Sequence, residues 1–309
     1  MSHPREQHPS HNERMLTTLE HIAGTLSRIA DALEGLDVVE RPADPEEAPA
    51  NDPARADATT SEDGGDPERL EALRAFLSSR GVRIKAERAP DPADPILDRL
   101  AVLMGRRYPD IQPFYTTLKR NLNDGRRFTL NMKKAPQRTL STTCQFASRL
   151  HEVAFLEDYH YQRAPRCLLH ATPNRIPRAI NFLTGGWLER YAVREVIDTL
   201  QALRPGVPFA WLKNPQVVLP NGDDFELDVL FEIDGQVLWL ELKTGDYQRH
   251  IAKYARVSRL LGLDVSQSFM VLTGIQADAA AELSALFHMT VTPIDALGET
   301  LEGVLGTAG

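Results

Sequence analysis

The sequence predicts an α/β protein whose C-terminal domain has the element order helix, three strands, helix, strand, preceded by a small helical domain. Three observations support this prediction. Residues 226–245 contain two apolar runs joined by a two-residue turn, an amphipathic helix begins upstream near Trp187, and a helix and a further strand follow. Three helical segments and two short strands within residues 68–173 are expected to form the preceding domain.

The N-terminal segment, residues 1–39, has the pattern of a coiled-coil helix. Its apolar residues alternate spacings of four and three for about three heptads: Met15, Leu19, Ile22, Leu26, Ile29, Leu33 and Leu36. A seam of this kind favours pairing with a second copy, so we expect a homodimer. A helix that packs on its own domain is the alternative.

Residues 40–67 are predicted to be a disordered linker. They are rich in Pro, Ala, Gly and acidic residues and have almost no apolar side chain to bury. Because this linker separates the N-terminal seam from the rest of the chain, it favours the dimer over folding back.

Composition limits the other possibilities. The chain has 309 residues, of which 42% are hydrophobic and 25% charged. No apolar run approaches the roughly 20 residues of a membrane span, and the first residues lack the apolar core of a secretory signal. Cys144 and Cys167 form no CxxC motif. We therefore expect a cytoplasmic protein without a membrane segment, and the absence of a GxxxxGK[ST] loop argues against an ATP-driven motor.

The charge is unevenly distributed. The net charge is −8, but residues 1–66 contain 5 Lys and Arg against 15 Asp and Glu. Residues 99–194 contain 17 against 6, a net of +11. A field of this sign attracts phosphate backbones, which predicts DNA or RNA as a partner.

The basic residues lie in residues 68–173, where we expect a winged-helix domain. Helices are predicted at 95–107, 112–121 and 141–152, and strands at 154–161 and 167–171. The candidate nucleic-acid-binding residues are Arg126, Arg127, Lys133, Lys134, Arg163 and Arg166, the last two on the wing. Residues 126–138 could instead form a strand and a basic loop packed on the C-terminal domain, or the basic face could simply be solvated.

The turn at Asp234-Gly235 sets the register of the C-terminal hairpin. This dipeptide suits a type I′ two-residue loop. Counting back along both strands places Asp228 opposite Glu241, with Lys243 two residues further on the same face. We refer to Asp228 and Glu241 as the acidic pair.

Opposed carboxylates destabilise a sheet unless a positive charge lies between them. A divalent cation would supply that charge. The alternative is a solvated hairpin face, but Trp239 and Leu230 share this face, which argues against open solvent.

Further helices and strands are predicted around the hairpin within residues 174–309. The helix from Trp187 places Glu189 on an apolar stripe with Val193, Val196 and Leu200. Later elements are expected as a strand at 216–219, a helix at 247–261, and strands at 268–273 and 290–292. A carboxylate on an apolar stripe requires a partner, although a half-exposed Glu in a first helical turn is also common.

The pattern D-x(12)-E-x-K on two adjacent strands resembles the active site of the PD-(D/E)xK nuclease superfamily, which has a restriction-endonuclease-like fold. The runs NFLTGGWLERY and FELDVLFEIDGQVLWLELKTG, followed by a helix with Lys253 and Tyr254, are similar to the nuclease domain of CRISPR-associated effectors that cyclic oligoadenylates activate. The resemblance covers residues 178–275. Nothing before residue 178 has the pattern of that family's Rossmann-like sensing domain.

The resemblance implies that the acidic pair binds Mg²⁺ or Mn²⁺, Lys243 is the catalytic lysine and Glu189 assists. We therefore expect a metal-dependent endonuclease acting on DNA or RNA, with a role in antiviral or other genome defence. The sequence leaves open whether an activating ligand or partner protein is required. The alternative is a dimeric winged-helix regulator whose nuclease-like domain is an inactive scaffold.

Overall fold

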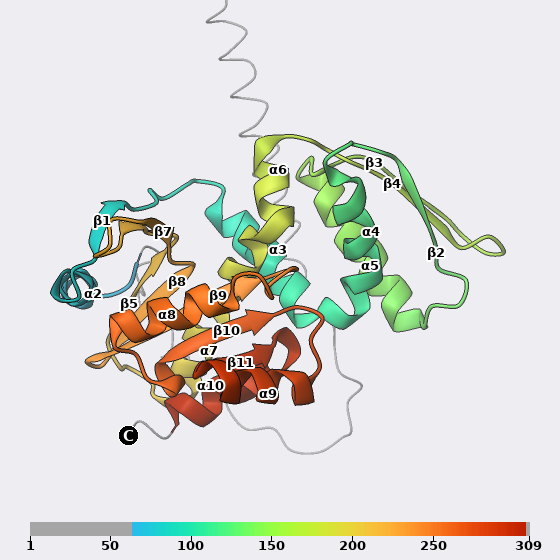
Figure 1. Cartoon of the computed structure of the whole chain (residues 1–309). Helices are drawn as coiled ribbons and strands as arrows, with labels where there is room; N and C mark the ends of the chain where they lie inside the picture. The colour runs from blue at the N-terminus through green and yellow to red at the C-terminus, as the bar shows by residue number, and fades with distance from the viewer. Residues whose placement is uncertain (1–63, 307–309) are drawn as a thin grey trace, which may run out of the picture. The chain divides into compact units, whose positions relative to one another are not determined.

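A five-stranded mixed sheet organises the C-terminal half of the chain. The structure is a computed structural model that describes residues 64–306, and Figure 1 shows how the elements are arranged. The strand order is β11-β10-β9-β8-β5. The strands are β5 (Phe209–Lys213), β8 (Val229–Ile233), β9 (Gln236–Lys243), β10 (Ser268–Leu272) and β11 (Thr290–Pro293). β9, β10 and β11 are parallel, whereas β8 is antiparallel to both β9 and β5.

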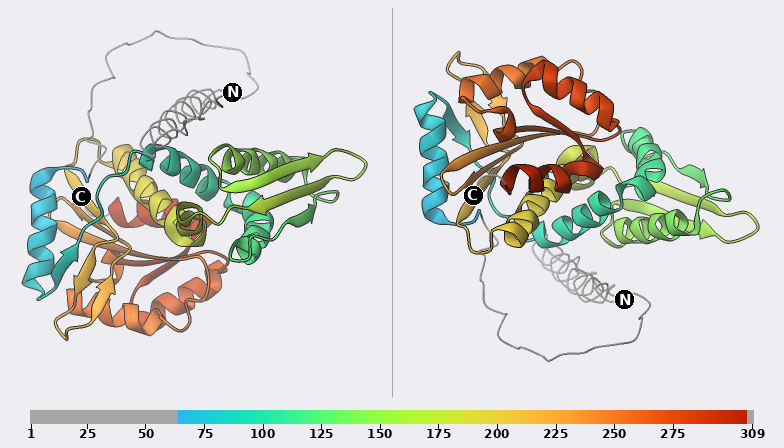
Figure 2. Two further views of the ribbon diagram at one scale, coloured as in Figure 1. Left: turned by 90° about the horizontal axis from the view of Figure 1, so that it is seen from above. Right: turned by 90° about the horizontal axis from the view of Figure 1, so that it is seen from below.

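Helices cover both faces of this sheet, as the two views in Figure 2 show. The helices are α2 (Pro67–Ser79), α7 (Trp187–Leu203), α8 (Ile251–Leu261), α9 (Ala277–Phe287) and α10 (Leu297–Leu305), with the short turns η1 (Phe182–Gly186), η2 (Val265–Gln267) and η3 (Ile294–Ala296). Phe231 and Leu240 join an apolar core with α7 and α10. Leu230 and Trp239 join a second core with α2 and α8. Alternate side chains of each strand therefore enter different cores.

The helix expected near Trp187 begins at that residue, directly after a π-helical turn that contains both glycines of the Gly-Gly break. The strands expected at 268–273 and 290–292 are also present. The helix expected from residue 247 begins later, at Ile251, and ends at Leu261. The next residue, Gly262, has a φ of 68°, the left-handed value that glycine adopts readily.

The first strand of the central sheet differs from the one that the sequence predicts. Residues 216–218 do form a strand, β6 (Gln216–Val218), but it lies in a separate sheet between β1 (Arg83–Ala86) and β7 (Asp224–Glu226). The central position belongs to β5, which pairs with β8 through Trp211↔Phe231. The two strands are only a few residues apart, and pairing with β8 rather than local pattern distinguishes them.

The residues around the expected linker end at 67 pair with the central sheet. Residues 64–66 pair with the edge of β5, because Asp66 N donates to Phe209 O (2.9 Å) and Trp211 N donates to Gly64 O (3.0 Å). Asp66 then caps α2 by accepting from Glu68 N at 2.9 Å. Since α2 packs on the central sheet and β1 pairs with β6, residues 67–86 accompany the C-terminal strands rather than the basic helices. The predicted coiled coil, its dimer and most of the predicted linker lie outside the described residues.

The basic region contains the three predicted helices and both predicted strands. These are α3 (Asp94–Arg106), α4 (Tyr108–Leu122), α5 (Gln137–Glu152), β3 (Leu156–Gln162) and β4 (Leu168–Pro173), with α6 (Pro177–Asn181) leading to η1. An additional strand, β2 (Phe128–Asn131), gives an antiparallel sheet of order β2-β4-β3. The strand of the alternative for residues 126–138 therefore forms, and it pairs with β4 of the basic region.

The basic helices share one apolar core with the C-terminal half. Leu100 of α3, Phe114 of α4 and Trp187 of α7 all belong to it. Tyr108 stacks on Trp187 with ring centroids 5.6 Å apart. Packing therefore continues across residues 173 and 174, where the sequence predicts a domain boundary. Within residues 64–306, no helix has the length and apolar character required to cross a membrane.

Candidate active site

The hairpin that carries the acidic pair has the predicted register. Ile233 pairs with Gln236, and Phe231 pairs with Leu238. Asp234 and Gly235 have φ values of 51° and 88°, as a type I′ turn requires. The ladder ends at Val229, one residue before Asp228.

Asp228 turns its carboxylate onto the neighbouring strand. Its Oδ2 accepts a hydrogen bond from the backbone N–H of Leu242 at 2.8 Å, and its own carbonyl accepts from Asn214 N at 2.9 Å. These bonds fix Asp228 where the strand has already ended. The same interruption places Leu227 in the core with Trp239, although strict alternation predicts that it would share a face with Val229.

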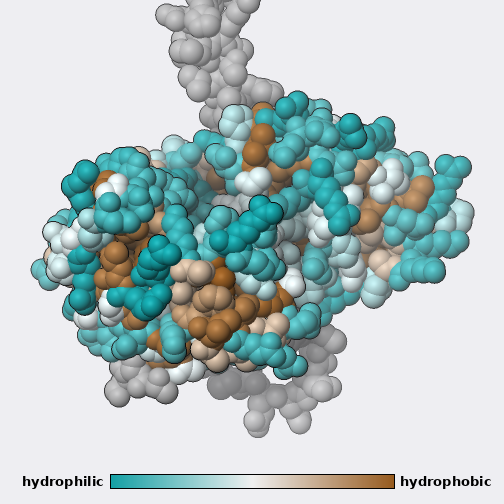
Figure 3. Space-filling model, in the orientation of Figure 1, coloured by the Kyte–Doolittle hydropathy of each residue, from teal (hydrophilic) through white to brown (hydrophobic). Residues whose placement is uncertain are grey.

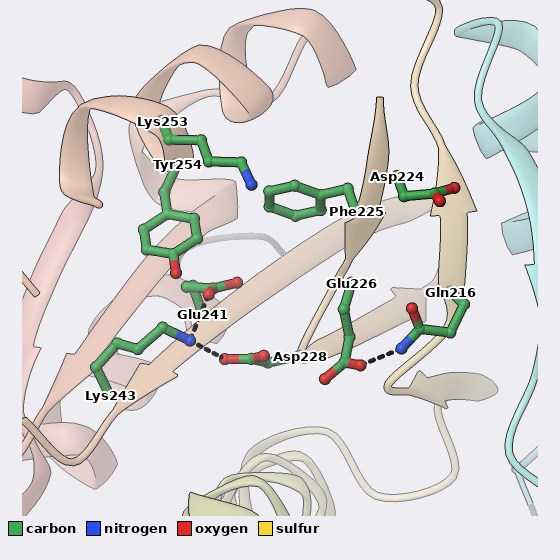
Figure 4. A pocket seen from close by; sticks show the side chains of 9 residues that line it. All are labelled: Gln216, Asp224, Phe225, Glu226, Asp228, Glu241, Lys243, Lys253 and Tyr254. Carbon is green, nitrogen blue, oxygen red and sulfur yellow. Dashed lines mark hydrogen bonds and ion pairs between the residues drawn. The ribbon is translucent and has the colours of Figure 1, made fainter. Parts of the chain in front are cut away.

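Lys243 lies between the two carboxylates (Figure 4). Its Nζ is 3.0 Å from Asp228 Oδ2 and 2.6 Å from Glu241 Oε1. The positive charge that opposed carboxylates require is therefore supplied by the third residue of the motif.

Because both carboxylates are buried, keeping them charged is energetically costly. Asp228 is 6% exposed and Glu241 1%. Burial raises the pKa of Glu241 well above its usual range, the charge of Asp228 raises it further, and Lys243 opposes both effects. For Lys243, burial acts to lower the pKa, but Glu241 and Asp228 outweigh it and raise the pKa. Lys243 is therefore a charged ammonium at neutral pH.

A pocket of about 300 Å³ opens beside these side chains. It is lined by Gln216, Asp224, Phe225, Glu226, Asp228, Glu241, Lys243, Lys253 and Tyr254. In Figure 4, Lys253 points over the ring of Phe225, with its Nζ 4.6 Å from the ring centroid, and the hydroxyl of Tyr254 points toward Glu241. Figure 3 shows that hydrophilic residues cover much of the face seen there, with hydrophobic residues gathered below its centre. The pocket combines carboxylates, two lysines and an aromatic wall.

The donor set fits a hard divalent cation. Among residues 64–306, the buried Glu241 Oε2 has no hydrogen-bond partner, so this oxygen can accept a ligand. Within residues 64–306, no three His, Cys, Asp or Glu side chains come close enough to form a complete ligand set. Mg²⁺ commonly uses one or two carboxylates and takes its remaining ligands from water and substrate phosphate. The acidic pair satisfies that requirement.

Glu189 is connected to Asp228 but is not one of the residues that line the pocket. Its Oε2 accepts a hydrogen bond from Asn214 Nδ2 at 2.9 Å, and Asn214 N in turn binds the carbonyl of Asp228. Burial, and then the charge of Asp228, raise the pKa of Glu189 to about 7. The structure thus connects Glu189 to Asp228 through Asn214, a residue that the sequence did not single out.

Four of the six predicted nucleic-acid-binding residues lie at one end of the β2-β4-β3 sheet. Asn131, at the end of β2, and Gln162, at the end of β3, both pair with Leu168 at the start of β4. The turns that follow β2 and β3 hold four exposed basic residues, here called the wing-tip cluster: Lys133, Lys134, Arg163 and Arg166. No ion pair within residues 64–306 involves a member of this cluster.

Arg126 and Arg127 lie at the opposite end of the same sheet. Arg126 is 3.4 Å from Asp124 and Arg127 is 3.6 Å from Asp158, and both arginines are exposed. Their charges are partly offset, unlike those of the wing-tip cluster.

Sequence reasoning missed several pocket residues. Gln216 and Glu226 are joined by a hydrogen bond across β6 and β7, and Phe225 forms the wall beneath Lys253. The alternation of Glu226 and Asp228 is a weak signal that both face one side. Gln216 could not have been found, because its strand was assigned to the central sheet.

Comparison of the sequence with protein-family models and with curated proteins gives no match. Similar solved structures include the protein VC1899 from Vibrio cholerae (21% identity, TM-score 0.50) and Can2 from Sulfobacillus thermosulfidooxidans in complex with cyclic tetra-adenylate (16% identity, TM-score 0.50). Each match covers 76% of this chain and 60% of the other. The likeness shows a shared fold, and the chain spans about 60% of the length of these structures.

Proposed function

We propose that this protein is a metal-dependent nuclease that hydrolyses phosphodiester bonds of DNA or RNA. One observation supports this most directly: the acidic pair and Lys243 share a pocket in which a buried oxygen of Glu241 has no hydrogen-bond partner in the described part of the chain. A carboxylate buried with one oxygen unpaired is costly unless a ligand occupies it.

In this proposal the acidic pair holds Mg²⁺ or Mn²⁺, which when bound polarises the phosphate and lowers the pKa of a water molecule. The ammonium of Lys243 offsets negative charge that develops on the phosphate oxygens. Lys253 faces the same pocket and is suited to a neighbouring phosphate. Glu189 positions Asn214, and through it Asp228, while the wing-tip cluster attracts the nucleic-acid backbone.

The fold shared with Can2 extends the proposal to regulation. Can2 is a protein solved with cyclic tetra-adenylate, and the sequence resembles effectors activated by cyclic oligoadenylates. We therefore include a role in antiviral defence, with an activating ligand or partner protein. Cleavage should be assayed with and without cyclic oligoadenylates, because a silent apo form would otherwise be mistaken for an inactive protein.

The test is cleavage of single- and double-stranded DNA and RNA in Mn²⁺ and in EDTA. Asp228→Asn and Glu241→Gln keep side-chain size but remove a metal-binding charge, so each should abolish cleavage. Asp234→Asn is the matched control: it makes the same change at the far end of the hairpin, where Asn-Gly also suits the turn. Within residues 64–306 the Asp234 carboxylate forms an ion pair only with Arg204, at the surface, so this variant should retain activity.

A second candidate is a nucleic-acid-binding regulator with an inactive scaffold. It is favoured by the two ion pairs of Lys243, which offset the charge of the acidic pair without metal. In that case wild-type protein would bind nucleic acid, take up no Mn²⁺, and cut nothing under any of the conditions above.

A further inference from the structure

Lys119 of α4 is a half-buried lysine that contacts the residue directly after the proposed catalytic lysine. Its Nζ donates to the carbonyl oxygen of Thr244 at 3.0 Å and to the hydroxyl at 2.8 Å. The ammonium also lies 5.9 Å from the ring centroid of Tyr115. Burial lowers the pKa of Lys119, and no carboxylate within residues 64–306 forms an ion pair with it. A cation kept in a partly buried place without a counter-ion is costly, which favours a specific role.

Thr244 is held on a second side as well. Its hydroxyl accepts from Lys119 and donates to the carbonyl oxygen of Thr184, in η1, at 2.7 Å. The backbone of Lys243 is tied to the next strand, because Thr273 N donates to Lys243 O at 3.1 Å. The end of β9 is therefore fixed by α4, η1 and β10 together.

The contacts that hold Thr244 come from two parts of the chain. Lys119 belongs to the basic helices, and Thr184 precedes α7. Tyr115, one turn before Lys119, strengthens the junction by donating to Leu183 O at 3.0 Å and accepting from Trp187 Nε1 at 3.1 Å. A movement of α4 would therefore displace Thr244, the residue that follows Lys243.

We propose that Lys119 is a positioning residue for the reaction at Lys243. Acting through Thr244, it holds the end of β9 so that the ammonium of Lys243 remains between the two carboxylates of the acidic pair, and it links the basic helices to the active site. The proposal rests on the proposed nuclease function. Catalysis is sensitive to such placement, since an error of about 1 Å can lower the rate by about 100-fold.

The test compares Lys119→Met and Thr244→Val with wild type. Both should lower kcat by about 10-fold to 100-fold, while KM and the Kd for nucleic acid change by less than about 2-fold. Because both variants weaken the same junction between Lys119 and Thr244, the double variant should be slower than either single variant by less than the product of their separate effects. Lys119→Arg keeps the charge and the donors, so it should recover part of kcat. Arg120→Met removes an exposed cation from the next position of α4 and should leave kcat unchanged.

A readout that does not need activity follows from the bond to Lys243 O. Amide hydrogen exchange of Thr273 should be faster in Lys119→Met than in wild type and unchanged in Arg120→Met. If wild-type protein cuts nothing either with or without cyclic oligoadenylates, the proposed nuclease function fails, yet this exchange still decides whether Lys119 holds the end of β9.

Three results would overturn the proposal. A higher KM with unchanged kcat would show that Lys119 contacts substrate phosphate instead. Unchanged exchange at Thr273 would show that Thr244 does not depend on Lys119. A Lys119→Arg variant as slow as Lys119→Met would mean that the two hydrogen bonds are not what matters.

Discussion

Replacing Lys243 with Met removes the ammonium that lies 3.0 Å from Asp228 and 2.6 Å from Glu241. No other ion pair within residues 64–306 involves either carboxylate. The change leaves two buried acids facing each other without a counter-charge among residues 64–306, although the backbone N–H of Leu242 still donates to Asp228. Removing one partner of a buried pair costs about 3–5 kcal/mol. Because the Lys243 side chain is 25% exposed, we expect a smaller loss, about 2–3 kcal/mol in the free energy of unfolding.

For a folded unit of this size, that loss corresponds to a fall in Tm of roughly 4–12 °C. The pH dependence has a definite sign. The pKa of Glu241 is raised on folding, and it should rise further without Lys243, so stability is retained at low pH and lost as pH increases. The fall in Tm should therefore be larger at pH 8 than at pH 5.

Mn²⁺ should reverse the effect, because the ion no longer competes with an ammonium for the acidic pair. At 100 times its Kd, a ligand of the folded state adds about 2.7 kcal/mol. Calorimetry in EDTA and in Mn²⁺ should show a larger Mn²⁺-dependent increase in Tm for Lys243→Met than for wild type. Turnover of the same samples should fall by about 100-fold or more.

Lys253→Met is the matched control, since Lys253 lines the same pocket and lies over the ring of Phe225 but forms no ion pair within residues 64–306. It should cost about 1 kcal/mol or less and show no pH-dependent loss. If Lys243→Met melts like wild type in EDTA at pH 8, or if Mn²⁺ stabilises the two proteins equally, the electrostatic account of the site is wrong.

Three further predictions concern other parts of the chain. In wild type, the raised Glu189 pKa of about 7 should lower the free energy of unfolding by on the order of 3 kcal/mol as the pH rises from 4 to 8. Glu189→Gln cannot titrate, so urea unfolding of this variant should not show that loss. Replacing all four residues of the wing-tip cluster with Ser should weaken nucleic-acid binding and reduce its salt dependence, whereas the same change at Arg126 and Arg127 should have a smaller effect in the same titrations. Deleting residues 1–39 should convert a dimer into a folded monomer; light scattering that finds the full chain monomeric at micromolar concentration would contradict this.

The hairpin shows how much local pattern can predict. Asp234-Gly235 specifies a turn whose twist matches the strands, and a side-chain period of two then determines every cross-strand partner. The positions of the acidic pair and Lys243 follow by counting. The helix at Trp187 could be predicted equally well, because an apolar stripe after two glycines is a local signal.

Local pattern could not predict which of β5 and β6 lies in the central sheet. Both are short, partly apolar segments, and only pairing with β8 places one in the central sheet. The position of α2 is similar, since its Leu73 and Leu77 could be buried against any apolar surface. Such pairings are contacts between distant residues, and local propensity carries no information about them.

The sequence by itself determined the turn, the register and the three charged residues of the motif, because each depends on neighbours within one hairpin. Only the tertiary structure decided that Lys243, rather than solvent, separates the acidic pair, that Glu189 reaches Asp228 through Asn214, and that Lys119 holds Thr244. Those contacts join residues from separate elements. Their energies depend on burial, which arises only when the two apolar cores close around the sheet.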